Sequence, residues 1–359
     1  MSFAAEQLGH LVPVTLLTGF LGSGKTTVLN TLLHHPGFGR TAVIVNEFGE
    51  IGLDHELVVS SNDSMVLLQS GCLCCSLRGD LLDTLRDLGD SRIAGDVDFD
   101  RVVIETTGLA DPAPILHTLL TSYDLSQQFR VDGVVTTVDA ATGVETLVCH
   151  EEARRQAALA DLILLTKTDL PESREDELRE RLLDLNASAP VLRVIDGQVD
   201  PARLCDLGHF DLGMKSEAVR AWMQQDAVPE PGQGNGDVLR HRDAIRAVSW
   251  VVERPLTASQ FDLWMELLMA RRGQDLLRFK GLVHLADVPH PFVVHGVQHL
   301  FHPPVVLKDW DGDDRRTKFV MIVNDFTDPE LRDLFDALNA IPATANLPPD
   351  GYLTAEVPA

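Results

Sequence analysis

One stretch decides the fold of this chain: Gly19-Phe20-Leu21-Gly22-Ser23-Gly24-Lys25-Thr26. It fits the pattern G-x-x-x-x-G-K-[ST] and lies between an apolar run, Val14–Thr18, and a helix-like run, Thr26–Leu33. Glycines at these positions let successive backbone N–H groups turn inward around an anion, at a helix start whose dipole favours negative charge. The stretch therefore predicts a loop, called the phosphate loop below, that binds a nucleoside triphosphate.

Two side chains of the phosphate loop carry the expected chemistry. Lys25 is expected to reach the β- and γ-phosphates, and the Thr26 hydroxyl to ligate Mg²⁺. A chance glycine-rich turn is disfavoured because a strand-like run and a helix-like run flank the motif. The other expected nucleotide contacts are Gly19, Gly22, Ser23, Gly24 and Thr27.

Short β-branched runs alternate with longer amphipathic runs from residue 12 to about residue 195. This alternation predicts an α/β fold, a P-loop NTPase domain whose mostly parallel sheet is flanked by helices. Ligands of such sheets bind beyond the carboxyl ends of the strands. The expected strands are Val14–Thr18, Thr41–Val45, Met65–Leu68, Arg101–Glu105, Val131–Val138, Leu162–Thr166 and Val191–Ile195.

A second unit follows a Pro- and Gly-rich stretch, Val228–Gly236, that has no periodicity. Its expected strands are Ala247–Glu253, Leu282–Leu285, Phe292–Val297 and Phe319–Val323, with helices at Ser259–Ala270 and Pro329–Leu338. This order predicts a smaller α+β C-terminal domain. We expect the P-loop domain at residues 10–212, a linker at 213–243, the C-terminal domain at 244–341 and an extended tail at 342–359.

Charge and composition exclude several classes of partner. With 30 Lys and Arg against 54 Asp and Glu, the formal net charge is -24, which repels nucleic-acid backbones and anionic lipids. We therefore expect no nucleic acid partner and no membrane partner, and no run reaches the roughly 18 apolar residues of a membrane span. Five cysteines, three of them within four positions, are no disulfide framework and predict a reduced, cytoplasmic protein.

Thr166-Lys167-Thr168-Asp169, the guanine loop, follows an expected strand and resembles the N-K-x-D guanine motif with Thr in place of Asn. A carboxylate at Asp169 would accept hydrogen bonds from guanine N1–H and its 2-amino group, which adenine lacks. The Lys167 stem would pack over the base. A plain polar loop at a strand end is the alternative; the position behind a phosphate loop favours GTP and GDP.

Glu105-Thr106-Thr107-Gly108 ends another apolar strand. Glu105 is expected to hold Mg²⁺ through water, and the Gly108 N–H to contact the γ-phosphate. Loss of that phosphate would release the loop, as in the order–disorder switch of GTPases. A strand-end carboxylate that caps the next turn is the alternative.

Gly71-Cys72-Leu73-Cys74-Cys75-Ser76 places three thiols at an expected helix start, which lowers thiol pKa values and favours thiolates. Thiolates select Zn²⁺ or Cu(I). Adjacent Cys74 and Cys75 do not easily ligate one ion together, so Cys72, Cys74 and Cys75 offer two or three ligands, which suits metal transfer. Glu50 or Glu47 could supply another ligand. A redox thiol centre and an inert structural cluster remain alternatives.

Together these motifs resemble the CobW-type GTPase metallochaperones, relatives of the urease and hydrogenase nickel-insertion GTPases. The resemblance extends to about residue 340. Besides the motifs above it includes Asn46–Glu50, Leu109–Pro112, Val138-Asp139, Arg278–Gly281 and His295–Gln298, and C-x-C-C is the family hallmark. Two departures are Val45, where some relatives have glutamate, and the missing His-rich loop.

The resemblance implies slow GTP hydrolysis coupled to delivery of Zn²⁺, or in some relatives Co²⁺, to a client metalloprotein. One alternative is a nucleotide-gated activator or assembly factor for one metalloenzyme, or for cobalt insertion in the cobalamin pathway. Another is a metabolic kinase or ATPase with redox-sensitive cysteines. The sequence leaves room for a homo-oligomer.

Five histidines fall between residues 284 and 302: His284, His290, His295, His299 and His302. Alternation in a strand would place His295 and His299 on one face, as a secondary metal site. Solvated or hydrogen-bonded histidines on a small sheet are the favoured interpretation, and a client-docking surface is a third.

Overall fold

The structure is a computed structural model that describes residues 11–45, 65–69, 77–205, 207, 244–302, 304–307, 310 and 314–343. For residues 65–69 and 77–80 it describes the backbone alone. The chain divides into two compact units, Met1–Arg181 with Ala189–His209, and Leu182–Ser188 with Phe210–Ala359. Each unit is described by itself. Within the described residues, no helix combines the length and apolar character needed to cross a membrane.

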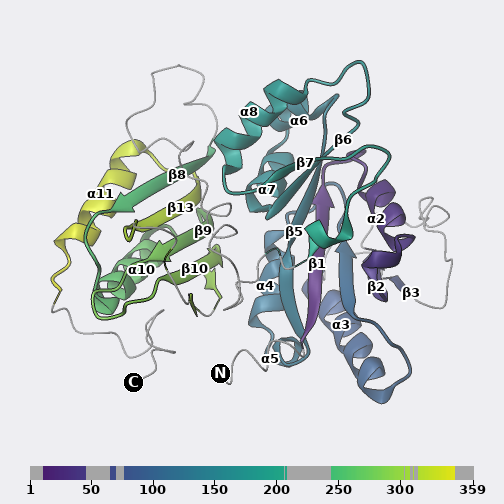
Figure 1. The fold of residues 1–359 in the computed structure, drawn as a ribbon, viewed down its shortest axis with the longest axis horizontal. Coiled ribbons are helices and arrows are strands. Elements are labelled where there is room, and N and C mark those ends of the chain that lie inside the picture. The colour runs from purple at the N-terminus through teal and green to yellow at the C-terminus, as the bar shows by residue number, and fades with distance from the viewer. Residues whose placement is uncertain are drawn as a thin grey trace. The chain divides into compact units, whose positions relative to one another are not determined.

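A seven-stranded parallel sheet organises the first unit, in the order β3-β2-β4-β1-β5-β6-β7 (Figure 1). The predicted α/β fold is therefore confirmed. The strands are β1 (Val12–Gly19), β2 (Thr41–Val45), β3 (Met65–Gln69), β4 (Arg101–Glu105), β5 (Phe129–Asp139), β6 (Leu162–Thr166) and β7 (Val191–Arg193). β7 is shorter than predicted because Asp196 and Gly197 take positive φ angles, and Ile195 and Gln198 bridge across that turn.

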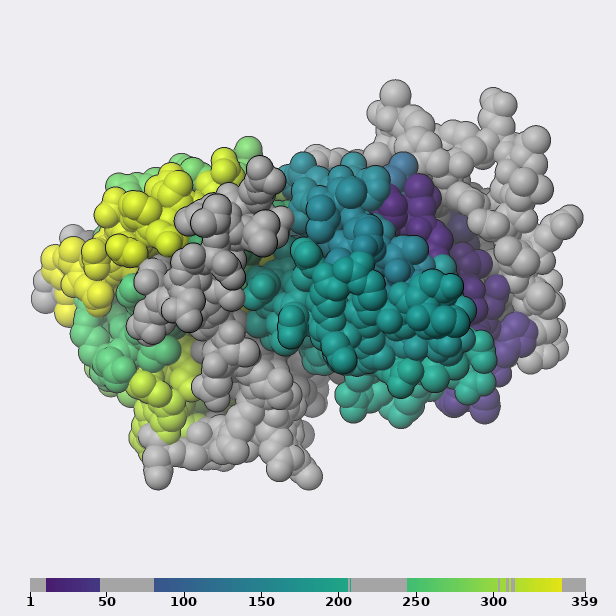
Figure 2. All heavy atoms as spheres, turned by 90° about the horizontal axis from the view of Figure 1, so that it is seen from above, coloured from purple at the N-terminus to yellow at the C-terminus, as the bar shows by residue number. Residues whose placement is uncertain are grey.

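Helices follow most strands. They are α2 (Lys25–Leu33), α3 (Leu77–Ala94), α4 (Ala113–Thr121), α5 (Tyr123–Ser126), α6 (Gly143–Cys149), α7 (Glu151–Leu159) and α8 (Glu175–Asn186), with 3-10 turns η1 (Pro36–Phe38) and η3 (Pro201–Leu204). Figure 2 shows the described residues of this unit, purple to teal, as one continuous packed body.

Both faces of the parallel sheet are covered, as β5 demonstrates. Val135 packs in an apolar cluster with Val28 and Leu32 of α2. The next residue, Thr136, donates a 2.8 Å hydrogen bond from its hydroxyl to the backbone carbonyl of Gln156 on α7. Because successive strand side chains point to opposite faces, α2 and α7 cover opposite faces of the sheet (Figure 1). This coverage explains why all of β6 is buried and apolar up to its last residue.

The strand order brings four strand ends together. β4, β1, β5 and β6 are neighbours in the sheet, and all run in the same direction. Their last residues are Glu105, Gly19, Asp139 and Thr166. The phosphate loop, the Glu105 motif and the guanine loop therefore begin side by side at one sheet edge, as the sequence predicts.

An antiparallel sheet organises the second unit, in the order β11-β10-β9-β13-β8, with β12 paired to β10. One face buries an apolar core with two helices. The elements are β8 (Ile245–Val252), α10 (Ala258–Arg272), β9 (Leu276–Val283), β10 (Phe292–Val297), β11 (Leu300–Phe301), β12 (Val305–Val306), β13 (Thr317–Asn324) and α11 (Asp328–Ala340).

The predicted strand Leu282–Leu285 is wrong in its position. β9 begins at Leu276 and ends at Val283, and Leu285 makes only an isolated bridge with Leu256. Arg278 and Lys280 alternate with apolar residues in β9 yet are buried, so local polarity concealed the strand.

Candidate nucleotide site

The phosphate loop has the backbone shape that its glycines predict. Gly19, Gly22 and Gly24 have φ angles of 142°, 71° and 92°, which side-chain-bearing residues rarely adopt. A Cβ built on Gly19 would lie 2.3 Å from the Thr137 hydroxyl oxygen. Gly24 is the N-cap of α2, so the loop leads directly into a helix N-terminus. A glycine turn that leads into a helix N-terminus favours an anion there.

Lys25 lies inside this loop and is buried. Its Nζ donates hydrogen bonds to the carbonyl oxygens of Gly19 at 2.9 Å and Phe20 at 3.2 Å. These bonds hold a full positive charge within the turn of the loop. A charged donor in this position can bind phosphate oxygens through charge-assisted hydrogen bonds.

The two predicted Mg²⁺-binding side chains are in contact. The Thr26 hydroxyl donates a 2.7 Å hydrogen bond to Glu105 Oε1, although 79 positions separate the two residues. Thr26 is half-buried and Glu105 is buried. A hydroxyl and a carboxylate are hard oxygen donors of the kind that Mg²⁺ prefers, so the residues present fit that ion.

Thr166, which stands where the guanine motif has Asn, braces the phosphate loop. Its hydroxyl donates to the carbonyl oxygens of Ser23 at 2.7 Å and Val138 at 3.3 Å. Ser23 in turn shares a 2.7 Å hydrogen bond between its hydroxyl and that of Thr137. The threonine therefore links the guanine loop to the phosphate loop despite its shorter side chain.

The rest of the guanine loop is held by an ion pair. Lys167, with a φ of 55°, donates from Nζ to Asp139 Oδ2 at 2.7 Å. Asp139 Oδ1 accepts a 2.8 Å hydrogen bond from the Ala141 N–H. Asp169 itself is exposed at the end of the loop. Sequence reasoning gave Asp139 no role; its signal was a carboxylate at the end of an apolar strand.

The Glu105 loop, defined as Glu105–Ala110, packs directly on the phosphate loop. Thr106 donates from its hydroxyl to that of Thr18 at 2.8 Å and from its N–H to the Leu17 carbonyl at 3.0 Å. A Cβ built on Gly108 would lie 2.6 Å from the Leu21 nitrogen. Only glycine allows this close approach, which places the predicted γ-phosphate sensor against the phosphate loop.

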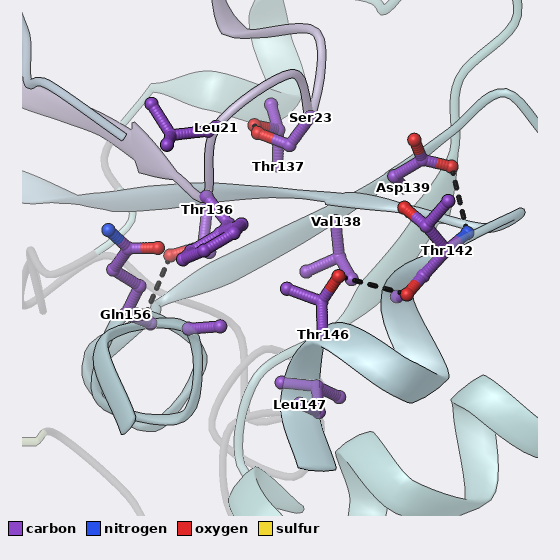
Figure 3. A pocket seen from close by; sticks show the side chains of 13 residues that line it. Leu21, Ser23, Thr136, Thr137, Val138, Asp139, Thr142, Thr146, Leu147 and Gln156 are labelled. Atoms are coloured by element: carbon purple, nitrogen blue, oxygen red, sulfur yellow. Dashed lines mark hydrogen bonds between the residues drawn. The ribbon is translucent and has the colours of Figure 1, made fainter. Parts of the chain in front are cut away.

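A pocket lies on the α6 and α7 side of the phosphate loop (Figure 3). It has about 320 Å³ of empty volume, including its opening to solvent. Its walls include Phe20, Leu21 and Ser23 of the phosphate loop, the end of β5 from Thr136 to Asp139, and Gln156 of α7. Sequence reasoning did not identify Gln156, which is fully buried on the face of α7 that also buries Ala153 and Ala157, and which belongs to no motif.

Of the remaining predicted site residues, the structure describes Thr27 but not the predicted metal ligands. Thr27 is exposed on the first turn of α2. The predicted metal ligands Cys72, Cys74, Cys75, Glu47 and Glu50 lie outside the described residues. In the described part of the chain, no group of three or more His, Cys, Asp or Glu could hold a metal ion.

The alternative that placed His295 and His299 on one strand face is not supported, because His299 lies beyond the end of the strand. β10 ends at Val297, and Gln298, with a φ of 53°, starts the turn that carries His299. The ring of His302 stacks on that of His295, with centroids 4.1 Å apart and planes within 8°. The His302 N–H also donates to the His295 carbonyl at 3.0 Å. Local alternation failed here because the chain turns one residue after the strand ends.

Fold and site together define a P-loop nucleotide-binding protein. The model of the CobW/HypB/UreG nucleotide-binding domain matches residues 13–193, and that of the cobalamin synthesis protein cobW C-terminal domain matches residues 245–339. The chain therefore belongs to the CobW/HypB/UreG family.

The proteins most relevant for comparison have names that refer to zinc, to GTPase activity or to both. The zinc chaperone YjiA of Escherichia coli strain K12 is 35% identical over 331 residues, which cover 91% of this chain and 98% of YjiA. The zinc-regulated GTPase metalloprotein activator 1 of Schizosaccharomyces pombe is 34% identical over 53% of this chain and 47% of its own length. The crystal structure of Zn(II)-bound YjiA GTPase from E. coli has a TM-score of 0.70 at 31% identity, covering 91% of this chain and 99% of that one.

Proposed function

We propose that this protein is a GTP-hydrolysing metallochaperone that binds Zn²⁺ at Cys72, Cys74 and Cys75 and delivers it to a client metalloprotein. The chain is a GTPase of the zinc-chaperone class, as its family and its relatives' names indicate. The main observation that supports the nucleotide-binding part of the proposal is the 2.7 Å contact between Thr26 and Glu105. It joins the phosphate loop to the loop that would detect the γ-phosphate.

Hydrolysis would depend on position and charge. Water attacks the γ-phosphorus, the bond to the β,γ-bridging oxygen breaks, and GDP leaves with the electron pair, while the oxygen and protons of the water stay with the inorganic phosphate product. The Lys25 ammonium and the loop N–H groups of Gly22 and Gly24 would neutralise the charge that develops on the phosphate oxygens. Thr26 and Glu105 would hold Mg²⁺, which supplies further charge neutralisation when bound. Gly108 would contact the γ-phosphate through its N–H.

Guanine selectivity would come from Asp169, whose carboxylate pairs with the N1–H and 2-amino groups of the base. The Asp139–Lys167 ion pair supports this role because it fixes the residue two positions before Asp169. Thr166 supports it by bracing the loop. An ATP-specific kinase or ATPase, the rival class, would have no use for a carboxylate at this position.

Zinc is cargo in this proposal. The thiolates of Cys72, Cys74 and Cys75 would bind it, with Glu47 or Glu50 as a further ligand, and Co²⁺ would be a second metal. The support comes from the chemistry of the motif and from the Zn(II)-bound title of the similar YjiA structure. The cysteine motif alone supplies only two or three of the four ligands of a closed zinc site, and this favours release to the client.

The proposal includes the expected division of the chain: a P-loop domain at 10–212, a linker at 213–243, a C-terminal domain at 244–341 and a tail at 342–359. The family ranges 13–193 and 245–339 support it. A reduced cytoplasmic setting and a homo-oligomer are compatible with it. The alternative, an activator of one metalloenzyme, is favoured by the name of the S. pombe relative.

The test is a zinc titration of the metal-free protein with GDP, and then with a non-hydrolysable GTP analogue. We expect the zinc dissociation constant to differ between the two nucleotide states. Cys74→Ala should weaken zinc binding at least about tenfold, since it removes a thiolate ligand. Cys149→Ala is the matched control because Cys149 is a free, exposed cysteine outside the motif. Identical zinc affinity in both nucleotide states would contradict nucleotide-dependent delivery.

A further inference from the structure

The side chain of Gln156 joins helix α7 to the Glu105 loop. Its Nε2 donates hydrogen bonds to the carbonyl oxygens of Gly108 at 3.1 Å and Ala110 at 3.0 Å. Gln156 is completely buried. Its own backbone carbonyl accepts from the Thr136 hydroxyl on β5 at 2.8 Å. One residue therefore ties the loop to the sheet and the helix at the same time.

The contacts also fix the orientation of the carboxamide. An amide nitrogen carries two N–H donors, and here each has a carbonyl acceptor. The reverse orientation would place the amide oxygen against two carbonyl oxygens and is disfavoured. In Figure 3 the amide oxygen of Gln156 faces the pocket and the nitrogen points away from it. That oxygen, Oε1, is buried and has no hydrogen-bond partner.

A buried acceptor without a partner costs free energy, so the presence of glutamine at this position needs an explanation. An apolar side chain of similar size would avoid this cost but could not hold the two carbonyls. A lysine could hold them but would bury a charge in the same place. Glutamine is the side chain that meets the geometric requirement of two neighbouring acceptors without a charge.

The two carbonyls lie in the turn that carries Gly108. The Ala110 N–H donates to the Thr107 carbonyl at 3.1 Å and closes this turn. Gly108 itself packs against the Leu21 backbone of the phosphate loop. Fixing the Gly108 and Ala110 carbonyls therefore fixes how the turn is rotated above the phosphate loop, and with it the direction of the Gly108 N–H.

We propose that Gln156 is a positioning residue for γ-phosphate detection: it holds the Gly108 turn in place, so that GTP, but not GDP, gains affinity from it. This inference rests on the proposed GTPase function. GDP lacks the phosphate that the Gly108 N–H would contact. Loss of the Gln156 hydrogen bonds should therefore affect the two nucleotides unequally.

The test compares Gln156→Met with wild type, using fluorescent GDP and a fluorescent non-hydrolysable GTP analogue. Methionine keeps the volume but donates no hydrogen bond. We expect GDP affinity within about twofold of wild type, and about tenfold weaker binding of the GTP analogue, since two hydrogen bonds are lost. Gln127→Met is the matched control because Gln127 is exposed after α5. It should bind both nucleotides as wild type does.

Each other outcome is decisive. Equal losses for GDP and the GTP analogue, or no loss for either, would overturn the positioning role while leaving the GTPase function standing. A wild-type protein that binds neither nucleotide would overturn both. Should Gln156→Met fail to fold, Gln156→Asn serves instead, since it keeps the donors but withdraws them from the carbonyls by one methylene. We expect the same selective loss; if this variant fails to fold too, the role is structural and the proposal is wrong.

Discussion

The two sheets of this protein carry different kinds of side-chain contact. Polar groups gather where β4, β1, β5 and β6 end, and they bond to one another across 79 to 143 positions of sequence. The second unit instead fills one face of its antiparallel sheet with large aromatic rings. These belong to Phe261, Trp264, Phe279, Phe319 and Phe335, with centroids 5.1 to 6.3 Å from at least one other ring.

The difference teaches where function and stability are located. Parallel strands direct all their carboxyl ends to one edge, so polar loops from distant parts of the chain meet there. An antiparallel sheet sends successive strand ends to opposite edges and provides no such meeting point. Substitutions at the first site should therefore abolish binding with little loss of fold, and substitutions in the aromatic core should do the reverse.

Lys25→Ala should have the largest effect on binding. It removes the buried ammonium that donates to the loop carbonyls and would bind the phosphates. We expect guanine nucleotide affinity to fall at least about a thousandfold, or about 4 kcal/mol. Isothermal titration calorimetry with GDP measures this, with circular dichroism to verify folding. Tight GTP binding by a folded variant would refute the assignment of the phosphate loop.

Trp264→Ala tests the other half of the comparison. Trp264 is fully buried, and its indole N–H donates to the Leu334 carbonyl at 2.8 Å. Truncation should destabilise the second unit by about 3–5 kcal/mol through the lost burial and the cavity. Urea unfolding followed by circular dichroism should show an earlier transition, while GDP affinity stays near wild type. An equally large loss of GDP affinity would contradict the assignment of nucleotide binding to the first unit and of this stability contribution to the second.

Asp169→Asn sharpens the assignment of the base. The change removes the charged acceptor for two guanine donors, so GDP should bind about 100-fold more weakly, or about 3 kcal/mol. Asp176→Asn, at an exposed position on α8, is the control. The asparagine amide can donate to a 2-oxo group, so xanthosine diphosphate should gain affinity in the variant. Unchanged GDP affinity would leave the base unassigned.

Thr327→Ala should have the smallest effect. Thr327 and Glu330 form a capping box at the start of α11, in which the Thr327 N–H and hydroxyl each donate to Glu330 Oε2 at 2.8 Å. Loss of the cap should destabilise the second unit by about 1 kcal/mol in urea unfolding. A loss as large as that of Trp264→Ala would show that the cap contributes as much to the stability of this unit as the aromatic core does.

The same box gives a pH dependence. Hydrogen bonds from Thr327 lower the pKa of the Glu330 carboxyl below its ordinary value. A lowered pKa in the folded state stabilises the protein above the unfolded pKa, and this contribution is lost as pH falls through the folded pKa. The difference in unfolding free energy between wild type and Thr327→Ala should therefore shrink in acid, below about pH 4.

The sequence by itself determined where the seven strands of the first unit lie, apart from the length of β7, and where the phosphate loop lies. It could do so because buried parallel strands are continuous apolar runs and because the motif fixes backbone shape through its own glycines. These are local properties, readable within about ten residues. The linker and the cysteine motif stay predictions, since they lie outside the described residues.

Only the tertiary structure decided which distant groups meet. Thr166 reaches Ser23 across 143 positions, and Gln156 reaches Gly108 across 48. In the second unit it decided that buried Arg278 and Lys280 belong to β9 and that the ring of His302 stacks on that of His295. Such contacts depend on strand order and on which helix face packs against the sheet. No local pattern of residues encodes either, because both are set by the packing of the whole unit.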